Sequence, residues 1–546
     1  MDNVAEEIDA VVVGAGFAGL YALHKLRAQG LSVKVFEAAD DVGGTWYWNS
    51  YPGARCDVES MRYSYSFDPE LEQEWEWTEK YASQPEILSY LRHVADRFDL
   101  RKDVVFGTRV TRASFDEDTS RWHVRTNRGH EVSARYCVMA VGCLSAPKYP
   151  EAPGLDTFSG PWYHTGLWPG SGVDFGGQHV GVIGTGSSGI QAIPFLAEQA
   201  RELTVFQRTP NYSLAAFNGP LDAEQVAGIK ANYREFRDAD RSSIFGIAVE
   251  WPTQSALEVT DAERRAMYEE RWNRGHLNGL VQSYTDLIFN EAANETAAEF
   301  VREQVRGKVA DPATARKLEP RGYPFSTKRP CLDTGYYETY NRENVHLVDL
   351  REEDIVEITE TGVRTTAGEY EFDSLVLATG FDAMTGALLG IDITGKDGVT
   401  LREKWQDGPG TYLGLAVSGF PNLFTVTGPG SPSVLSNMVL SIEQHVDWIS
   451  GLVGYMARHD RAVVEATDTA EKAWTEHVRE VSEMTLFPKA DSYYLGANVP
   501  GKPRVFMPYV AGCGAYRREC DEVAARGYEG FVLGTREAQA TTGRRA

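Results

Sequence analysis

A glycine-rich turn near the amino terminus has the spacing of a dinucleotide-binding loop. Gly14, Gly16 and Gly19 follow an apolar run and open a predicted helix. Glycine at these places permits a tight turn, close approach of a pyrophosphate, and contact between the helix and the strand. The start of the helix then offers free N–H groups to the phosphates. Glu37 ends the next predicted strand, where a carboxylate can accept both ribose hydroxyls, so we expect FAD at this turn.

A second turn of the same kind lies further along the chain but is followed by a different residue. Gly184 to Gly189 again joins an apolar strand to a predicted helix, and Arg208 ends the following strand. A guanidinium there can bind a 2′-phosphate through charge-assisted contacts, which selects NADPH over NADH. A solvated arginine at a strand end is the alternative. The predicted NADPH site comprises Gly184, Gly186, Ser187, Gly189, Arg208 and Thr209.

The elements that must position these turns form a duplicated unit of strand, turn, helix and strand. This pattern predicts an α/β protein with two Rossmann-like dinucleotide-binding domains, one for FAD and one for NADPH. We expect residues 1–141 and 381–546 to form the FAD-binding domain, and residues 142–380 the NADPH-binding domain. Two dinucleotides in one chain imply hydride transfer from the nicotinamide to the flavin.

Two local patterns refine this arrangement. Arg121 to Thr126 alternates in polarity and is expected to pair with Glu131 to Tyr136 across a turn at Asn127 to Gly129. Within the NADPH-binding domain, residues from about 215 to 323 are rich in Glu, Arg and Ala and contain the capping-box sequence Thr260 to Glu263. We expect this stretch to be a helical insertion that covers one face of the substrate site.

The charge and the cysteines argue against several classes of function. The 546 residues include 54 basic and 78 acidic side chains, a net charge of -24, which disfavours a nucleic-acid-binding surface. Six scattered cysteines contain no Cys-x-x-Cys pair and no zinc-ligand spacing, which disfavours a disulfide reductase and a metal site. The acidic amino terminus and the lack of a long apolar run predict neither an export signal nor a membrane span. We expect a cytoplasmic protein, and a monomer.

The segment between the two turns contains a longer motif. Residues 158–169 read Phe-Ser-Gly-Pro-Trp-Tyr-His-Thr-Gly-Leu-Trp-Pro and resemble the type I Baeyer-Villiger monooxygenase fingerprint FxGxxxHxxxWP. The fixed positions are Phe158, Gly160, His164, Trp168 and Pro169. Related flavin monooxygenases have a similar motif without the Trp-Pro ending. Because the motif lies between the turns, we expect it to link the two domains; a structural hydrogen-bonded histidine is the alternative for His164.

The resemblance extends over almost the whole chain and is closest to the phenylacetone and steroid monooxygenase branch. Residues 43–57 resemble the flavin-contacting loop of that family, and residues 328–337 resemble its active-site arginine segment. Tyr493 is a departure, because close relatives tend to have tryptophan there, near the nicotinamide. The cofactor contacts that the resemblance implies include Thr45, Trp46, Asp57, Lys328 and Tyr493. The implied substrate pocket includes Ser431, Pro432, Ser433, Val434 and Leu435.

The resemblance implies an enzyme that uses FAD, NADPH and O2 to convert ketones into esters or lactones through a C4a-peroxyflavin. Arg329 would stabilise the peroxide and then the oxyanion of the adduct, because its charge is permanent. Asp57 would hold that guanidinium in place, and Lys328 would be a second phosphate contact. A structural salt bridge is the alternative for Arg329.

Two other functions remain open at this point. A heteroatom monooxygenase acting on amines or sulfides would share both nucleotide sites, and sulfoxidation could also occur as a side activity of a ketone oxygenase. A nucleotide-binding sensor without turnover is the other function, and a purified protein that lacks FAD and consumes no NADPH would favour it. The sequence does not identify the ketone substrate, because pocket walls that are built from loops vary within one fold.

Overall fold

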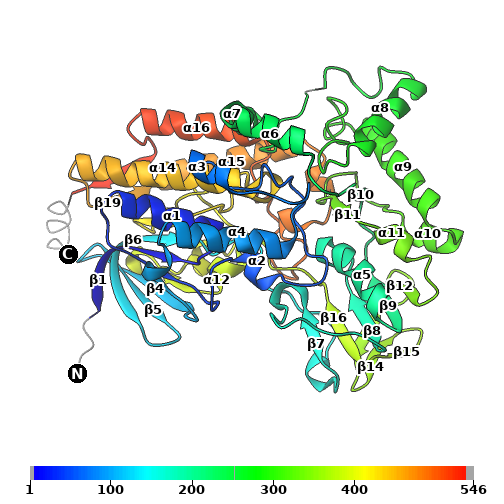
Figure 1. The fold of residues 1–546 in the computed structure, drawn as a ribbon. Helices are drawn as coiled ribbons and strands as arrows, with labels where there is room; N and C mark the ends of the chain where they lie inside the picture. Colours follow the sequence, from blue (N-terminus) through cyan, green and yellow to red (C-terminus); the bar gives the residue numbers. More distant parts are fainter. Residues whose placement is uncertain (1–4, 251, 536–546) are drawn as a thin grey trace.

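The computed structural model describes residues 5–250 and 252–535. Figure 1 shows two sheets side by side, one built mainly from amino-terminal strands and the other from strands in the middle of the chain. Helices pack on both sheets, so the α/β class with two dinucleotide-binding sheets that the glycine turns predict is confirmed.

The first sheet has β1 (Glu6–Val13) near its centre, where the apolar strand is buried on both faces. Alternate residues of β1 enter two apolar clusters, as the period of a strand requires. One cluster is shared with α1 (Phe17–Ala28) and α14 (Met438–Arg458), and the other with the antiparallel strands. The strand order is β17 (Asp392–Thr394), β4 (Val110–Asp116), β5 (Arg121–Thr126), β6 (Glu131–Met139), β1, β2 (Val33–Phe36) and β3 (Val104–Val105), and β18 (Leu423–Thr425) also pairs with β6.

The expected hairpin is confirmed as the antiparallel pair of β5 and β6. Beyond the hairpin, β6 continues beside β1 in parallel, so that Met139 lies opposite Val13. The carboxyl ends of β1, β2 and β6 therefore meet at one edge of the sheet, where the first glycine turn begins.

The second sheet is wholly parallel. One face of this sheet packs against α5 (Ser187–Gln199) and α11 (Tyr336–Thr339). The other face packs against a small antiparallel sheet of β13 (Ile355–Ile358), β14 (Gly362–Thr365) and β15 (Glu369–Glu371). The strand order is β12 (Val345–Asp349), β9 (Glu202–Gln207), β8 (His179–Ile183), β16 (Ser374–Leu377) and β7 (Trp162–His164).

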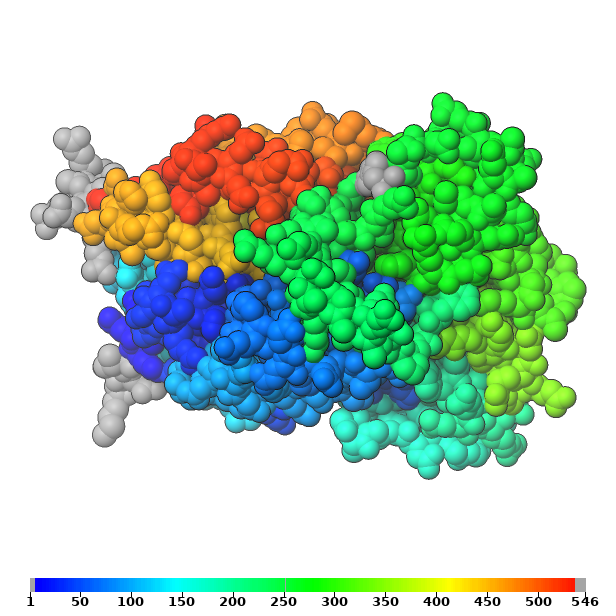
Figure 2. Space-filling view, turned by 45° about the horizontal axis from the view of Figure 1, so that its top comes forward, coloured from blue at the N-terminus to red at the C-terminus, as the bar shows by residue number. Residues whose placement is uncertain are grey.

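The helices between residues 215 and 323 contribute to three cores, one of which is that of the second sheet, through Val305, Ala315 and Leu318. These helices are α6 (Ala223–Ala231), α7 (Tyr233–Ser242), α8 (Asp261–Asn273), α9 (Glu291–Lys308) and α10 (Pro312–Leu318). The expected capping box is confirmed at the start of α8, where Thr260 and Glu263 bond reciprocally. Tyr233 of α7 is buried in the core of the first sheet, whereas α8 and α9 share a separate cluster with β10 (Ser213–Ala215) and β11 (Cys331–Asp333). In Figure 2 the insertion, in green, lies across the amino-terminal residues in blue.

The remaining α-helices and strands lie outside the two large sheets, and two of them, β19 and β20, pair in a separate two-stranded sheet. They are α2 (Thr45–Trp48), α3 (Pro69–Glu74), α4 (Gln84–Arg97), α12 (Gly386–Leu389), α13 (Leu401–Lys404), β19 (Val463–Ala466), α15 (Asp468–Glu483), α16 (Cys513–Ala525) and β20 (Phe531–Gly534). Among the described residues, no helix combines the length and the apolar character that crossing a bilayer requires.

Candidate active site

The first glycine turn joins β1 to α1 and has no room for side chains. Gly14 has a φ of +102°, and a Cβ there would overlap the carbonyl oxygen of Ala140. A Cβ on Gly19 would overlap the carbonyl of Gly14, so α1 packs directly on the end of β1. A Cβ on Gly16 would lie 3.3 Å from the Cα of Gly44. The turn therefore presents bare backbone at the carboxyl edge of the sheet, where a pyrophosphate approaches in a Rossmann fold.

Glu37 lies directly after β2, beside this turn, with 4% of its surface exposed. Its Oε2 accepts a hydrogen bond from the N–H of Ala15 at 2.6 Å, and its Oε1 accepts one from Ala39 at 2.7 Å. Burial raises the pKa of Glu37, although these hydrogen bonds oppose the shift. Each carboxylate oxygen keeps a lone pair for a further donor, which fits the ribose hydroxyls of FAD.

The loop that faces the turn supplies Thr45 and Trp46. Gly44, with a φ of +54°, precedes α2 and lies against Gly16. Thr45 is exposed at the start of α2, on the side of the turn. Trp46 is buried and donates its indole N–H to the hydroxyl of Tyr63 at 3.1 Å. Thr45 is thus accessible to a bound dinucleotide, while Trp46 stiffens the loop from the core.

The second glycine turn repeats the first at the carboxyl end of β8. Gly184 has a φ of +110°, and a Cβ there would overlap the carbonyl of Ala378. A Cβ on Gly189 would overlap the carbonyl of Gly184, which brings α5 onto the strand. In contrast, a Cβ on Gly186 would meet nothing within 4 Å, and the neighbouring Ser187 is exposed at the start of α5. This open space beside bare backbone fits a pyrophosphate.

Arg208 and Lys328 lie close enough for their charges to interact. Burial and the Arg208 charge lower the pKa of the Lys328 ammonium, and Asp491 opposes them. Within the described part of the chain, neither cation has a hydrogen bond or an ion pair, and the Lys328 ammonium lies 4.7 Å from the centre of the Tyr323 ring. The carbonyl of Thr209 accepts a hydrogen bond from Thr185 at 3.4 Å, which ties the end of β9 to the glycine turn. Two neighbouring cations without an ion pair among the described residues fit the 2′-phosphate of NADPH.

Arg329 is held by two segments that are far apart in sequence. Its Nε donates to Oδ2 of Asp57 at 2.8 Å, and its NH2 donates to Oδ1 of Asp57 at 2.8 Å. Its NH1 donates to the carbonyl oxygen of Val434 at 2.6 Å. Burial opposes the charge of Arg329, but the Asp57 carboxylate outweighs burial and raises the pKa of the guanidinium well above its ordinary value. Each terminal nitrogen has one further N–H, and the side chain of Tyr494 lies within hydrogen-bonding reach of the guanidinium.

The loop Ser431–Leu435 presents the Val434 carbonyl from a constrained backbone. Ser433 has a φ of +44°, which is uncommon for a residue with a side chain. Its hydroxyl lies 3.1 Å from the thiol of Cys143 and donates to the carbonyl of Thr427 at 3.1 Å. Ser431, Pro432 and Ser433 are buried, and Leu435 is half-buried. The loop is thus fixed from the core side and turns its backbone toward Arg329.

Tyr493 lies near Arg329 and next to Tyr494. Their ring centres are 4.5 Å apart. Burial raises the pKa of both hydroxyls, and the charge of Arg329 opposes that shift. The structure therefore brings Asp57, Arg329, Val434 and Tyr493 together, although they come from four separate segments.

The comparisons with known proteins agree with this geometry. Residues 11–218 match a family described as pyridine nucleotide-disulphide oxidoreductase. The chain is 42% identical over 533 residues to a Baeyer-Villiger monooxygenase of Pseudooceanicola batsensis, covering 97% of each protein. It is 43% identical over 536 residues to a phenazine N-monooxygenase of Lysobacter antibioticus, covering 98% of each. A solved structure of oxidized steroid monooxygenase bound to NADP gives a TM-score of 0.92 at 55% identity, covering 97% of this chain and 99% of the other.

The chain belongs to the Baeyer-Villiger monooxygenase family. It is therefore an FAD- and NADPH-dependent flavoprotein monooxygenase, and the expected similarity to steroid monooxygenase is confirmed. The six cysteines of this chain are all buried and unpaired.

The Baeyer-Villiger fingerprint lies where the chain crosses between the two sheets. His164 ends β7, accepts a hydrogen bond at Nδ1 from the N–H of Gly166 at 2.9 Å, and contacts the carbonyl of Lys148 with Nε2 at 3.2 Å. An acceptor at Nδ1 places the proton on Nε2, and burial lowers the pKa of this neutral imidazole. Lys148 and Phe381, whose ring lies 5.9 Å from that of His164, belong to the two segments that connect the sheets.

The other fingerprint residues pack around this crossing. Trp168 is 5% exposed, lies against the rings of Tyr163 and Phe175, and donates its backbone N–H to the carbonyl of Trp48 in the first domain at 3.1 Å. Phe158 is buried under the second sheet, and a Cβ on Gly160 would contact Phe158 and the carbonyl of Asp373. Part of the expected linker is thus an edge strand of the second sheet, because Trp162 to His164 pairs with β16.

Two residues of the Arg329 environment escaped prediction. Cys143 follows β6 in sequence as an isolated cysteine, and nothing in its spacing indicates that its thiol lies beside Ser433. Tyr494 follows Tyr493 directly, and the two consecutive aromatic residues were the only signal in the sequence at this point. Both acquire their positions from contacts between distant segments.

Proposed function

We propose that this enzyme inserts an oxygen atom beside the carbonyl of ketones, giving esters or lactones. The supporting observation is the bidentate pair of Arg329 and Asp57, which directs a permanent cation toward the loop Ser431–Leu435. We assign Arg329 as the catalytic cation, Asp57 as the residue that orients it, and Ser431–Leu435 as one wall of the ketone pocket.

The proposed catalysis is electrostatic. When bound, NADPH would supply the hydride and FAD would pass the electrons to O2, which supplies the inserted oxygen. The remaining N–H groups of Arg329 can donate to the carbonyl oxygen of the ketone as negative charge develops on it. Because Asp57 and Val434 already hold the guanidinium, little reorganisation is needed during the reaction.

A substrate screen tests the proposal. NADPH consumption is measured with cyclic, aryl and steroid ketones, and the products are identified by mass. A gain of one oxygen in an ester or lactone supports the proposal. Stoichiometric H2O2 without any oxygenated product from every ketone would overturn it.

Oxygenation of a heteroatom is the second candidate. The observation that favours it is the 43% identity to a phenazine N-monooxygenase over almost the whole length of both proteins. Pairs of ketones and heteroatom substrates of similar shape, including a thioether and an aromatic amine, separate the two functions. A kcat/KM that is higher for every ketone assigns the chain to ketone oxygenation, with sulfoxidation as a side activity; the reverse order assigns it to heteroatom oxygenation.

We also propose the organisation that accompanies this function. Residues 1–141 and 381–546 form the FAD-binding domain and residues 142–380 the NADPH-binding domain, because the two sheets draw their strands from these ranges. The protein acts as a monomer in the cytoplasm on small ketones and O2, without a nucleic-acid partner. The support for this setting is the net charge of -24 and the six unpaired thiols.

A further inference from the structure

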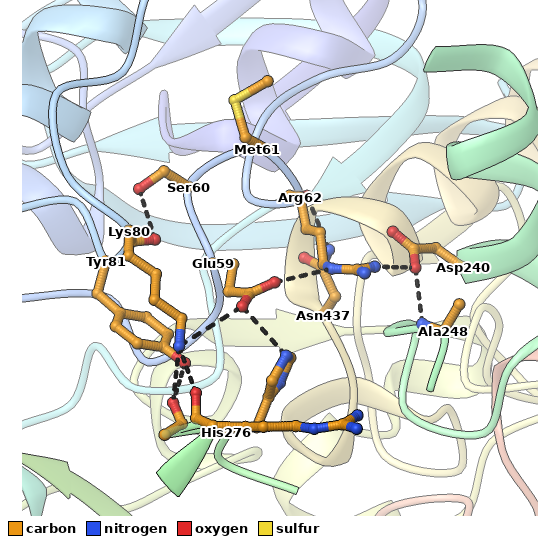
Figure 3. A network of polar contacts seen from close by, with 12 residues as sticks. Glu59, Ser60, Met61, Arg62, Lys80, Tyr81, Asp240, Ala248, His276 and Asn437 are labelled. Atoms are coloured by element: carbon orange, nitrogen blue, oxygen red, sulfur yellow. Dashed lines mark hydrogen bonds and ion pairs between the residues drawn. The ribbon is translucent and has the colours of Figure 1, made fainter. Parts of the chain in front are cut away.

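A second polar network begins two residues after Asp57 in the chain, and Figure 3 shows its side chains. Its centre is Glu59, whose carboxylate contacts Nε of Arg62 at 3.2 Å, Nε2 of His276 at 3.1 Å and the ammonium of Lys80 at 3.9 Å. Burial opposes ionisation of Glu59, but the hydrogen bond from His276 and the charges of these neighbours outweigh burial and lower its pKa. Glu59 is therefore an ionised carboxylate that joins three separate segments.

Arg62 continues the network into the helical insertion. Its NH1 donates to Oδ1 of Asp240 in α7, and that oxygen also accepts from the N–H of Ala248 at 2.7 Å. The side chain of Asp240 is 0% exposed and that of Arg62 only 11% exposed. The guanidinium also lies 4.3 Å from the centre of the Phe236 ring. Arg62 is thus fixed by two carboxylates and by the ring of Phe236.

Both segments that hold Arg329 are connected to Arg62. The first segment runs from Asp57 through Glu59, whose carboxylate is bonded to the Arg62 side chain. The second runs from Val434 to Asn437, whose amide Nδ2 donates to the Arg62 carbonyl oxygen at 2.8 Å. The side chain of Arg62 therefore holds one anchor of Arg329, and its backbone holds the other.

We propose that Arg62 is a positioning residue for oxygen transfer, which fixes the Asp57 segment relative to the Val434 loop and so keeps the Arg329 guanidinium directed at the substrate. The inference rests on the proposed role of Arg329. A guanidinium with anchors on two segments keeps its orientation only while those segments keep their separation. A displacement of about 1 Å costs as much as 10²-fold in rate when it misplaces a catalytic group.

The first test removes one link with little change in volume. Asn437 also caps α14, because its Oδ1 accepts from the N–H of Val439 at 3.2 Å. Asn437→Ser keeps an oxygen acceptor for the cap and removes the amide that donates to Arg62. Asn290→Ser is the matched control, because Asn290 caps α9 and has no contact with the segments that hold Arg329 among the described residues.

The second test removes the side chain of Arg62. Arg62→Met deletes both carboxylate contacts, and Arg62→Lys keeps a cation that can reach one of them. Arg302→Met is the matched control. Arg302 is 3% exposed and is ion-paired with Glu295 and Glu299, and its partners lie within the insertion and the adjoining β10 segment.

The readouts are FAD content, melting temperature, kcat and KM for the ketone, and the ester formed per NADPH consumed. For Asn437→Ser and Arg62→Met we expect normal FAD content, a KM close to wild type, an ester kcat lower by about tenfold, and more NADPH consumed without product. Arg62→Lys should recover part of the ester yield. Asn290→Ser and Arg302→Met should keep the wild-type ratio of ester to NADPH even where the melting temperature falls.

Two results would overturn the inference. One is a wild-type ester yield per NADPH in Asn437→Ser, which retains the cap and is the variant least disturbed in folding. The other is an equal loss of yield in the control variants, which would make the effect one of general stability. Absence of ester from the wild-type enzyme with every ketone would instead overturn the proposed function, and this inference with it.

Discussion

The guanidinium of Arg329 stays charged in the folded enzyme, because its interaction with the Asp57 carboxylate outweighs the cost of burying the charge. Three of its N–H groups are occupied by Asp57 and Val434. The chemistry available to the residue is therefore hydrogen bonding and charge stabilisation by the N–H groups that remain, and not proton transfer.

Replacing Arg329 with alanine tests that role. Arg329→Ala should leave FAD bound and reducible by NADPH, because Arg329 has no contact with either glycine turn among the described residues. Loss of a preorganised cation should lower the rate of ester formation by about 10² to 10³, or roughly 2.7 to 4 kcal/mol. Rapid-mixing absorbance of the flavin and product mass measure the two effects. Arg329→Lys is the control for charge without the bidentate geometry, and a wild-type ester yield in Arg329→Ala would remove Arg329 from the mechanism.

We expect Arg208 to act on a different ligand, the nicotinamide dinucleotide. Arg208→Ala should raise the KM for NADPH by about tenfold or more, because a charged hydrogen bond to the 2′-phosphate contributes about 1.5 to 3 kcal/mol. The KM for NADH should change much less, since NADH lacks that phosphate. Steady-state kinetics with both nucleotides provide the measurement. If the preference for NADPH persists, Lys328 becomes the principal phosphate contact, and Lys328→Met is the next variant.

At the scale of elements, the two glycine turns place α1 and α5 directly on the ends of β1 and β8. The second turn separates two functions of glycine. Gly189 provides contact between the helix and the strand, whereas Gly186 leaves open space beside the backbone. A methyl group added at these two positions should therefore have different consequences, for stability at Gly189 and for nucleotide binding at Gly186.

Gly189→Ala should lower the melting temperature, because its Cβ overlaps the Gly184 carbonyl and α5 must move, at a cost of about 1 to 3 kcal/mol. Gly186→Ala should leave the melting temperature near wild type and raise the KM for NADPH, because the methyl group enters the space for the pyrophosphate. Thermal denaturation and NADPH kinetics distinguish the two variants, and FAD content serves as the control in both. Tight NADPH binding by Gly186→Ala would place the pyrophosphate elsewhere.

The sequence was sufficient to predict elements whose signals are local. The glycine turns, the hairpin of β5 and β6 and the capping box at Thr260 follow from residue type and spacing within short segments. The positions of Asp57, Arg329 and Ser431–Leu435 were indicated only by the family resemblance. Their meeting depends on contacts between segments hundreds of residues apart, which no local period encodes.

Other features depend on tertiary packing alone. The insertion was expected as one unit, but Tyr233 packs with the first sheet while α8 and α9 form their own cluster. All these helices were predicted from the same kind of residues, rich in Glu, Arg and Ala. Their sequences therefore do not reveal which core each helix joins. The Glu59 and Arg62 network was also not predicted, because its partners Asp240 and His276 come from that divided insertion.

At the scale of the whole molecule, two chain segments connect the first and second sheets, and both pass His164. Its Nε2 contacts the carbonyl of Lys148 in the first crossing, and its ring lies against Phe381 in the second. The two crossings are themselves joined by the bridge between Pro147 and Phe381. To deliver hydride, the nicotinamide must lie against the flavin, and it must then move so that O2 and the ketone can reach the flavin. We therefore expect the two domains to adopt at least two arrangements. His164 is placed to influence the balance between those arrangements without contact to substrate.

His164→Ala removes the acceptor for Gly166 and the contact with Lys148 at the point where both crossings meet. We expect slower ester formation and more NADPH oxidised with release of H2O2, while FAD content stays near wild type. His346→Ala is the matched control, because His346 lies on β12 at the opposite edge of the same sheet and pairs with Glu202 at the surface. Rapid-mixing absorbance of the flavin and an H2O2 assay provide the measurements. Unchanged coupling in His164→Ala would mean that the histidine only completes the packing of the crossing, and domain rearrangement would then be controlled elsewhere.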